Sequence, residues 1–303
     1  MIFKSKPISL VVVLLVYIIA ALGGIAVFRL TPFDPVWAFL CADAAATVIV
    51  WAFGLIFKNA SLYDPYWSVA PPILFAFFLS QSQIFDAAGA LYIAVLAFWG
   101  VRLTLNWIVG WNGLQQQDWR YTMLRQKNKA LWPLTNFFGI NMMPTLIVFV
   151  NMLPAYYSTL TLANLGFLTV VGALICIGAV VVQVVSDRQM RLFRNDPANK
   201  NLNMESGLWR FSRHPNYLGE VSFWWGIYIM MLGQIPSHWW MIISPILMTL
   251  LFVFISIPMM EKRLLATKKG YADYQKSTSM LLPMPRKSVL FDECDSKSDS
   301  AVL

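Results

Sequence analysis

The sequence predicts an all-α, polytopic membrane protein: a bundle of about eight transmembrane helices with the N- and C-termini in the cytoplasm. Of its 303 residues, 58% are hydrophobic and only 13% are charged, about half the charged share that is typical of soluble domains. A chain with so little charge must use lipid as part of its solvent. Eight apolar stretches approach or reach the length of a bilayer span. They are residues 8–28, 36–57, 67–81, 88–110, 136–157, 162–185, 216–233 and 238–258. The third and seventh are the shortest, so seven spans is the alternative count.

The basic residues are distributed asymmetrically around these stretches. When the N-terminus is assigned to the cytoplasm and the sides alternate, all but two of the 23 Lys and Arg residues fall in cytoplasmic segments. The exceptions are Arg29 in an outer loop and Arg102 inside the fourth stretch. This bias indicates an even number of spans with both ends inside. It also explains the net charge of +8 without a nucleic-acid partner, which we do not expect.

Composition divides the chain into three parts. Residues 1–34 form an N-terminal transmembrane helix, residues 35–285 form a membrane domain with long cytoplasmic loops, and residues 286–303 form a polar tail that is typical of disorder. Lys4 and Lys6 before the first apolar stretch are similar to the start of a secretory signal. Because that stretch is long enough to span the membrane, we expect a retained helix.

Neither a disulfide framework nor a metal site is predicted. The cysteines Cys41, Cys176 and Cys294 are scattered without the spacing of either. The histidines His214 and His238 fall on opposite sides of the membrane in this topology, so they cannot share a metal ion.

The densest group of polar residues lies at 207–220, directly before the seventh apolar stretch. Asn216 and Glu220 are four residues apart and therefore share one face of a helix that enters the membrane. An acid at membrane depth is energetically expensive and is a functional candidate by default. The structural alternative is a helix cap in which a Glu–Arg pair fixes the loop. The candidate binding residues of this group are Arg213, His214, Asn216, Tyr217 and Glu220.

A second group ends the sixth apolar stretch. Gln183, Asp187, Arg191 and Arg194 follow the spacing of one helix face. Arginines at a helix end often only reach toward the membrane surface. Together with an acid and an amide, however, they suit an anionic ligand that also forms hydrogen bonds, because a planar guanidinium donates two hydrogen bonds to a phosphate at once.

Three residues on the cytoplasmic side of the third apolar stretch are the candidate catalytic group: Tyr63, Asp64 and Tyr66. A partly desolvated aspartate beside tyrosines could donate a proton or polarise a phenol hydroxyl. An interfacial aromatic belt with a turn at Asp64 and Pro65 explains the same residues equally well.

Further candidates for contact with an anionic ligand lie near the cytoplasmic ends of other stretches. Arg102 lies inside the fourth stretch with Asn106 one turn later, and Arg120 follows in the next cytoplasmic loop. Glu261 and Arg263 come directly after the last stretch. Contact of basic residues with anionic lipid headgroups is the structural alternative here.

In combination, these segments resemble the DUF1295 membrane proteins, which belong to the steroid 5α-reductase superfamily. The resemblance covers about residues 35–285. It is carried by SLYDPYWSVAPP (61–72), DWRY (118–121), SDRQMRLFR (186–194), SGLWRFSRHPNYLGE (206–220), EKR (261–263) and YADYQKSTSMLLP (271–283). It implies an all-helical membrane fold and the NADPH-dependent reduction of a carbon–carbon double bond that is conjugated to a ketone or activated in a sterol.

The resemblance also implies roles for individual residues. Asn216 and Glu220 match an Asn–Glu pair that holds the nicotinamide carboxamide or ribose in steroid reductases. Gln183 and Asp187, with the arginines after them, match an Asn–Asp–arginine series in which Gln here replaces Asn. Arg102 matches a membrane-embedded arginine that contacts the cofactor phosphates.

At the substrate end the chain departs from the steroid reductases. Their Gln–Glu pair falls on Tyr63 and Asp64, so an acid is kept in a shorter form and the amide becomes a phenol. This departure argues against assuming that a steroid is the natural substrate.

We therefore expect an NADPH-dependent reductase that transfers a hydride to the double bond of a lipid or steroid-like enone, with Asp64 and Tyr63 or Tyr66 at the carbonyl oxygen. Two alternatives stay open: an S-adenosylmethionine-dependent membrane methyltransferase and a non-enzymatic membrane protein that binds sterols or lipids. The expected partners are a lipophilic small molecule and membrane lipids, in a bacterial inner membrane or the endoplasmic reticulum.

Overall fold

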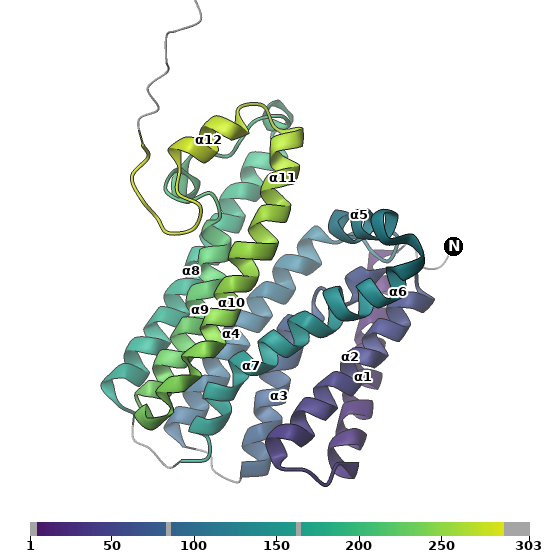
Figure 1. Cartoon of the computed structure of the whole chain (residues 1–303), viewed down its shortest axis with the longest axis vertical. Coiled ribbons are helices and arrows are strands. Elements are labelled where there is room, and N and C mark those ends of the chain that lie inside the picture. Colours follow the sequence, from purple (N-terminus) through teal and green to yellow (C-terminus); the bar gives the residue numbers. More distant parts are fainter. Residues whose placement is uncertain (1–4, 83–85, 162–164, 288–303) are drawn as a thin grey trace, which may run out of the picture. The chain divides into compact units, whose positions relative to one another are not determined.

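The computed structural model describes residues 5–82, 86–161 and 165–287, and every regular element in these ranges is a helix, which confirms the all-α prediction. The α-helices are α1 (Lys6–Leu30), α2 (Pro35–Ile56), α3 (Tyr66–Ser82), α4 (Ala87–Gly110), α5 (Trp119–Asn128), α6 (Trp132–Leu134), α7 (Met143–Ser158), α8 (Phe167–Asn195), α9 (Pro215–Leu232), α10 (Ile243–Leu251), α11 (Ile257–Thr267) and α12 (Tyr271–Ser277) (Figure 1). Two π-helical segments, η4 (Thr135–Met142) and η8 (Phe252–Ser256), join α6 to α7 and α10 to α11. Short 3-10 helices are η2 (Ala60–Leu62), η3 (Lys129–Leu131), η5 (Pro197–Asn199), η6 (Gly207–Arg210) and η7 (Pro236–Ile242).

The eight predicted apolar stretches fall mainly on helices. Within the described ranges, six continuous helical segments are long and apolar enough to cross a membrane. They are Lys6–Leu30, Pro35–Ile56, Ala87–Gly110, Trp119–Ser158, Phe167–Asn195 and Pro236–Thr267. The other two stretches form α3 and α9, which are 17 and 18 residues long. The structure thus supports a multi-pass membrane protein, and eight spans with both termini inside stay a prediction.

The chain folds into two compact units. The first comprises Met1–Val180 and Ser222–Thr249, and the second comprises Val181–Val221 and Leu250–Leu303. The helices α8, α9 and α10 each contribute residues to both units. Each unit is described below by itself.

The boundaries of these two units differ from those of the three parts that composition predicts. The helix predicted at residues 1–34 belongs to the same unit as α2, and the predicted domain at 35–285 contributes to both units. The predicted polar tail at 286–303 lies outside the described residues from position 288 onward.

Aspartates define where several helices of the first unit begin. Asp34 precedes Pro35 and accepts a hydrogen bond from a backbone N–H of the first turn of α2. Asp86 and Asp118 cap α4 and α5 in the same way. A side-chain oxygen at this position satisfies a backbone donor that has no partner within its own helix, and proline fits the first helical position. The starts of these helices are therefore fixed by local sequence.

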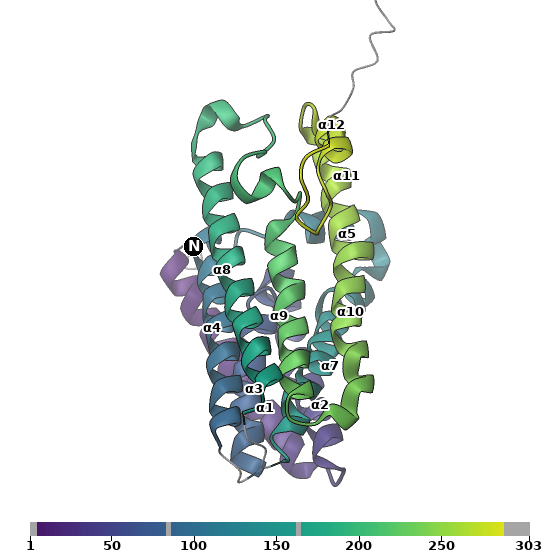
Figure 2. The ribbon, with the colours of Figure 1, turned by 90° about the vertical axis from the view of Figure 1, so that its left-hand side faces the viewer.

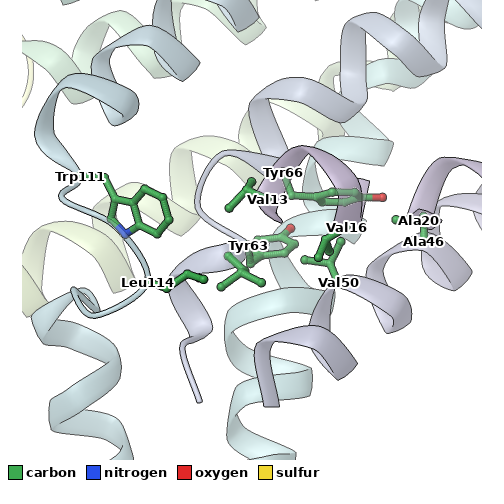
Figure 3. Close-up of a cluster of buried hydrophobic side chains, with 10 residues drawn as sticks. Val13, Val16, Ala20, Ala46, Val50, Tyr63, Tyr66, Trp111 and Leu114 are labelled. Carbon is green, nitrogen blue, oxygen red and sulfur yellow. The ribbon is translucent and has the colours of Figure 1, made fainter. Parts of the chain in front are cut away.

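Small residues allow α1 and α2 to pack closely in the first unit. A Cβ atom at Gly24 would lie 3.0 Å from the backbone oxygen of Ala42. Ala20 and Ala46 are buried at the same contact, and Figure 3 shows them with the surrounding apolar side chains. Because lipid is as apolar as these side chains, close packing between small residues is a main source of attraction between the two helices.

The connection from α8 to α9, whose course Figure 2 shows, is held within the second unit by hydrogen bonds. The indole nitrogen of Trp209 donates to the backbone oxygen of Ser186 across 3.1 Å. The hydroxyl of Tyr274 on α12 donates to the backbone oxygen of Trp209 across 2.5 Å. The backbone N–H of Arg213 donates to the oxygen of Ser279 across 2.8 Å. The connection is therefore fixed on one side to α8 and on the other to the C-terminal segment.

Candidate functional site

A buried hydrogen bond joins α8 to α9 within the second unit. The side-chain amide of Gln183 donates to Oε2 of Glu220 across 2.8 Å, and the two residues are 1% and 4% exposed. Asn216 is half-buried one turn earlier on α9. A buried carboxylate costs free energy unless donors surround it. The sequence predicted that these residues of distant segments serve one site, and the structure brings Gln183 and Glu220 into contact.

Charged side chains on α8 and α11 extend the site from this buried pair to the surface. Arg191, Arg194 and Arg263 are exposed, whereas Asp187 and Tyr217 are half-buried. Arg194 lies within electrostatic range of Arg263, Asp187 and Tyr217. Guanidinium groups beside an acid and a phenol offer donors for phosphate oxygens and acceptors for hydroxyl groups. The geometry therefore gathers the predicted anion-binding residues of the second unit.

The predicted binding residues Arg213, His214 and Glu261 form a cluster with one another. Nε of Arg213 donates to Oε1 of Glu261 across 2.7 Å, and Nε2 of His214 lies 3.0 Å from the same oxygen. Arg213 also donates to the backbone oxygens of Gln275 and Thr278. The cluster ties the start of α9 to α11 and the C-terminal segment, so a Glu–Arg pair fixes this loop, as in the structural alternative of the sequence analysis. Direct contact of these three residues with a cofactor stays a prediction.

Asp64, the predicted catalytic acid, lies partly buried in the connection between α2 and α3. The hydroxyl of Tyr121 on α5 donates to its Oδ1 across 2.5 Å. Burial raises the pKa of Asp64 from 3.8 to about 6, although the hydrogen bond from Tyr121 and the charge of Arg120 act in the opposite direction. The sequence analysis gave Tyr121 no role, yet the structure joins this tyrosine and Asp64 by a hydrogen bond.

The other two predicted catalytic residues, Tyr63 and Tyr66, have different partners. The hydroxyl of Tyr63 lies 2.8 Å from the hydroxyl of Thr145 on α7. The hydroxyl of Tyr66 donates to Oδ1 of Asp43 on α2 across 2.8 Å. Both rings belong to the apolar cluster in Figure 3. The three predicted catalytic residues are therefore neighbours in sequence whose polar atoms have different hydrogen-bond partners.

Asp43 is a buried acid that the sequence analysis overlooked. It is 8% exposed and lies in the middle of α2. It is the single acid within the apolar stretch 36–57, and an acid inside a transmembrane helix is a functional candidate by itself. The many small apolar neighbours keep the average hydropathy of the stretch high. The sequence therefore predicts a membrane span here, and Asp43 does not stand out as a candidate site residue.

The remaining predicted cofactor residues belong to the first unit. Arg102 and Asn106 are half-buried on α4. Arg120 forms an ion pair with Asp118 at the start of α5, with 2.9 Å between Nε and Oδ1. The pairing fixes the guanidinium of Arg120 beside the capping aspartate, so this residue supports the start of the helix that carries Tyr121.

Comparisons with known proteins identify a family. The family described as "Protein of unknown function (DUF1295)" matches residues 50–278. An uncharacterized protein of Schizosaccharomyces pombe is 24% identical over 220 residues, which cover 63% of this chain and 62% of that protein. The matched part of the chain thus spans less than two thirds of the length of that relative. No solved structure matches the chain.

Proposed function

The chain belongs to the DUF1295 family, and from the residues within the matched region we propose that it is an NADPH-dependent reductase of a carbon–carbon double bond in a lipid or steroid-like enone. The observation that carries the proposal is the buried Gln183–Glu220 pair with exposed arginines on the same and adjoining helices. The proposed setting is a bacterial inner membrane or the endoplasmic reticulum. The cofactor side faces the cytoplasm in the topology that the basic residues predict.

The side chains of the second unit fit this cofactor by their chemistry. The amide of Gln183 and the carboxylate of Glu220 offer the donors and acceptors that a carboxamide or a ribose needs. Arg191, Arg194 and Arg263 supply planar donors for phosphate groups. When it is bound, NADPH supplies a hydride. S-adenosylmethionine carries no phosphate, so it would make less use of these arginines.

Asp64 and Tyr121 are the proton source in the proposed reaction. Reduction first adds a hydride to the carbon of the double bond that is farther from the ketone. This step gives an enolate, whose negative charge lies largely on the carbonyl oxygen. A proton is then added to the other carbon. A hydroxyl or carboxyl group that donates a hydrogen bond to this oxygen stabilises that charge. Asp64 and Tyr121 share one hydrogen bond, and the raised pKa of Asp64, about 6, lets the pair hold and release a proton near neutral pH.

The proposal is tested first by cofactor binding to the detergent-purified protein. Thermal unfolding is measured with NADPH, NADH and S-adenosylmethionine for the wild type, Glu220→Gln and Glu205→Gln. A ligand at 100 times its dissociation constant stabilises the folded state by about 2.7 kcal/mol. We expect NADPH to stabilise the wild type and to lose most of this effect in Glu220→Gln. Glu205 pairs with Arg286 in the same unit, so Glu205→Gln is the matched control and should keep the full response.

Other outcomes of the same experiment distinguish the alternatives. Stabilisation by S-adenosylmethionine but not by NADPH would replace the reductase with a membrane methyltransferase. No response to either ligand would favour a non-enzymatic protein that binds sterols or lipids. Equal responses of Glu220→Gln and Glu205→Gln would remove Glu220 from the cofactor site.

A further inference from the structure

A cavity of about 360 Å³ lies within the first unit, between α1, α2 and α3. Its volume falls in the range of small-molecule binding sites. Tyr17 on α1, Asp43 on α2 and Tyr66 on α3 contribute its polar groups, and the rest of the wall is apolar. The cavity extends along α3 from Tyr66 to Phe77, a rise of about 16 Å. It can therefore hold an elongated apolar molecule with one polar end.

Asp43 gives this cavity its chemical character. Tyr66 donates to Oδ1 of Asp43 across 2.8 Å, and the hydroxyl of Tyr17 donates instead to the backbone oxygen of Leu62 across 2.6 Å. Among the hydrogen bonds recorded for the described residues, none goes to Oδ2 of Asp43. For a carboxyl group that is 8% exposed and lines a cavity, a second donor would offset part of the cost of burial. A ligand with a donor at one end would supply it.

The cavity opens toward the surface that faces lipid. Ala21 on α1 and Ile73 on α3 line it and are both exposed. At its far end, Phe77 packs edge to face against Phe28 and Phe39, with ring centroids 5.0 Å apart for Phe28 and Phe77. A ligand can therefore enter from the bilayer between α1 and α3, and the aromatic group limits how far it extends.

Most of the cavity wall precedes the region that defines the family. The family match begins at residue 50, so α1 and the part of α2 that carries Asp43 lie outside it. The cavity shares Tyr66 with the predicted catalytic residues, and it shares no residue with the Gln183–Glu220 site or with the Asp64–Tyr121 pair. The family assignment, the proposed cofactor site and the proposed proton source therefore leave its other polar groups, Tyr17 and Asp43, without a role.

We propose that this cavity binds a membrane-soluble molecule with an elongated apolar body and a hydrogen-bond donor, a hydroxyl or a protonated amine, at the end that contacts Asp43. The donor completes the hydrogen bonding of the buried carboxyl group, and the apolar body replaces lipid against α1 and α3. The inference is independent of the proposed reaction, because ligand binding here requires neither NADPH nor an enone.

The test is photo-crosslinking of the full chain in lipid nanodiscs. Three probes share one photoreactive alkyl chain and end in a primary alcohol, a primary amine or a methyl ether, which lacks a donor. Labelled peptides are mapped by mass spectrometry. We expect the alcohol and the amine to label α1 and α3 and the ether to label them about tenfold less, since a hydrogen bond to a charged group changes binding by about that factor or more.

Two variants locate the binding site. Ala70 lines the cavity and Ala76 is an exposed residue of the same helix, so Ala70→Leu should abolish the labelling and Ala76→Leu should leave it unchanged.

A third variant, Asp43→Asn, tests the contact with the carboxylate, because it keeps an acceptor but removes the charge. We expect Asp43→Asn to reduce labelling by the amine strongly and labelling by the alcohol little, and unchanged labelling by the amine would contradict its contact with Asp43. Equal labelling by the ether, or labelling that Ala70→Leu does not reduce, would overturn the proposal.

Discussion

Asp64 shows how one residue's surroundings set its chemistry. Burial favours its uncharged form and raises its pKa to about 6, against the hydrogen bond from Tyr121 and the charge of Arg120. Folding therefore carries a pH-dependent cost at this position. Below the unfolded pKa of about 4 the group is protonated in both states and costs nothing. Between about pH 4 and pH 6 the unfolded chain loses the proton and the folded protein retains it, so stability falls as the pH rises.

We predict that Asp64→Asn removes this part of the pH dependence. A shift of about two pKa units corresponds to about 3 kcal/mol, so the wild type should lose up to that amount of stability between pH 4 and pH 6 relative to the variant. Thermal unfolding in detergent across this range measures the difference. Asp273→Asn, at an exposed aspartate on α12, is the control and should follow the wild type. Parallel curves for wild type and Asp64→Asn would contradict the raised pKa.

At the scale of elements, helix contacts in this protein depend on single glycines. A Cβ atom at Gly100 on α4 would lie only 2.5 Å from the backbone oxygen of Ser68 on α3. Because backbone atoms cannot move aside as a flexible side chain can, the two helices would have to separate. The contact also positions the start of α3, which carries Tyr66 and follows Asp64. One small residue therefore connects helix packing to the candidate site.

We predict that Gly100→Ala destabilises the protein by about 1–3 kcal/mol, which is the usual cost of forcing extra volume into a packed contact. Gly110→Ala is the control on the same helix, because a Cβ atom there meets nothing within 4 Å. It should change stability by less than about 0.5 kcal/mol. The midpoints of thermal unfolding measure both effects. Equal midpoints for the two variants would show that α3 and α4 do not need to approach so closely.

At the scale of the whole molecule, the distribution of basic residues predicts which loops face the cytoplasm. The connection from α8 to α9 and the region after α11 are rich in Lys and Arg, whereas the connection from α9 to α10 contains none. The positive-inside rule assigns the first two to the cytoplasm and the third to the opposite side. The candidate cofactor residues of the second unit then face the cytoplasm.

This topology predicts opposite labelling of two exposed serines replaced by cysteine. Ser206 lies in the α8–α9 connection and Ser237 in the α9–α10 connection, and both are exposed. In a variant that lacks the native cysteines, a membrane-impermeant maleimide added to intact cells should label Ser237→Cys and should label Ser206→Cys only after permeabilisation. Labelling of both positions in intact cells, or the reverse pattern, would refute the predicted orientation.

Part of the candidate site could be predicted from the sequence, because helical periodicity alone places some of its residues on one helix face. The spacing of Gln183, Asp187 and Arg191 puts them on one face of a helix whatever that helix packs against. Glu220 stood out because an acid that enters a membrane is costly. Their place in one site was inferred from resemblance, and the hydrogen bond between Gln183 and Glu220 required the packing of α8 against α9.

The sequence by itself determined the all-helical membrane fold, because hydropathy and the length of each apolar stretch are local properties that the bilayer selects directly. Only the tertiary structure decided which polar groups meet. Tyr63, Asp64 and Tyr66 are neighbours in sequence, yet their hydroxyl and carboxyl groups pair with Thr145, Tyr121 and Asp43 respectively. Those partners come from different helices, and a hydrogen bond between distant segments depends on which helix faces pack together, which no local pattern specifies.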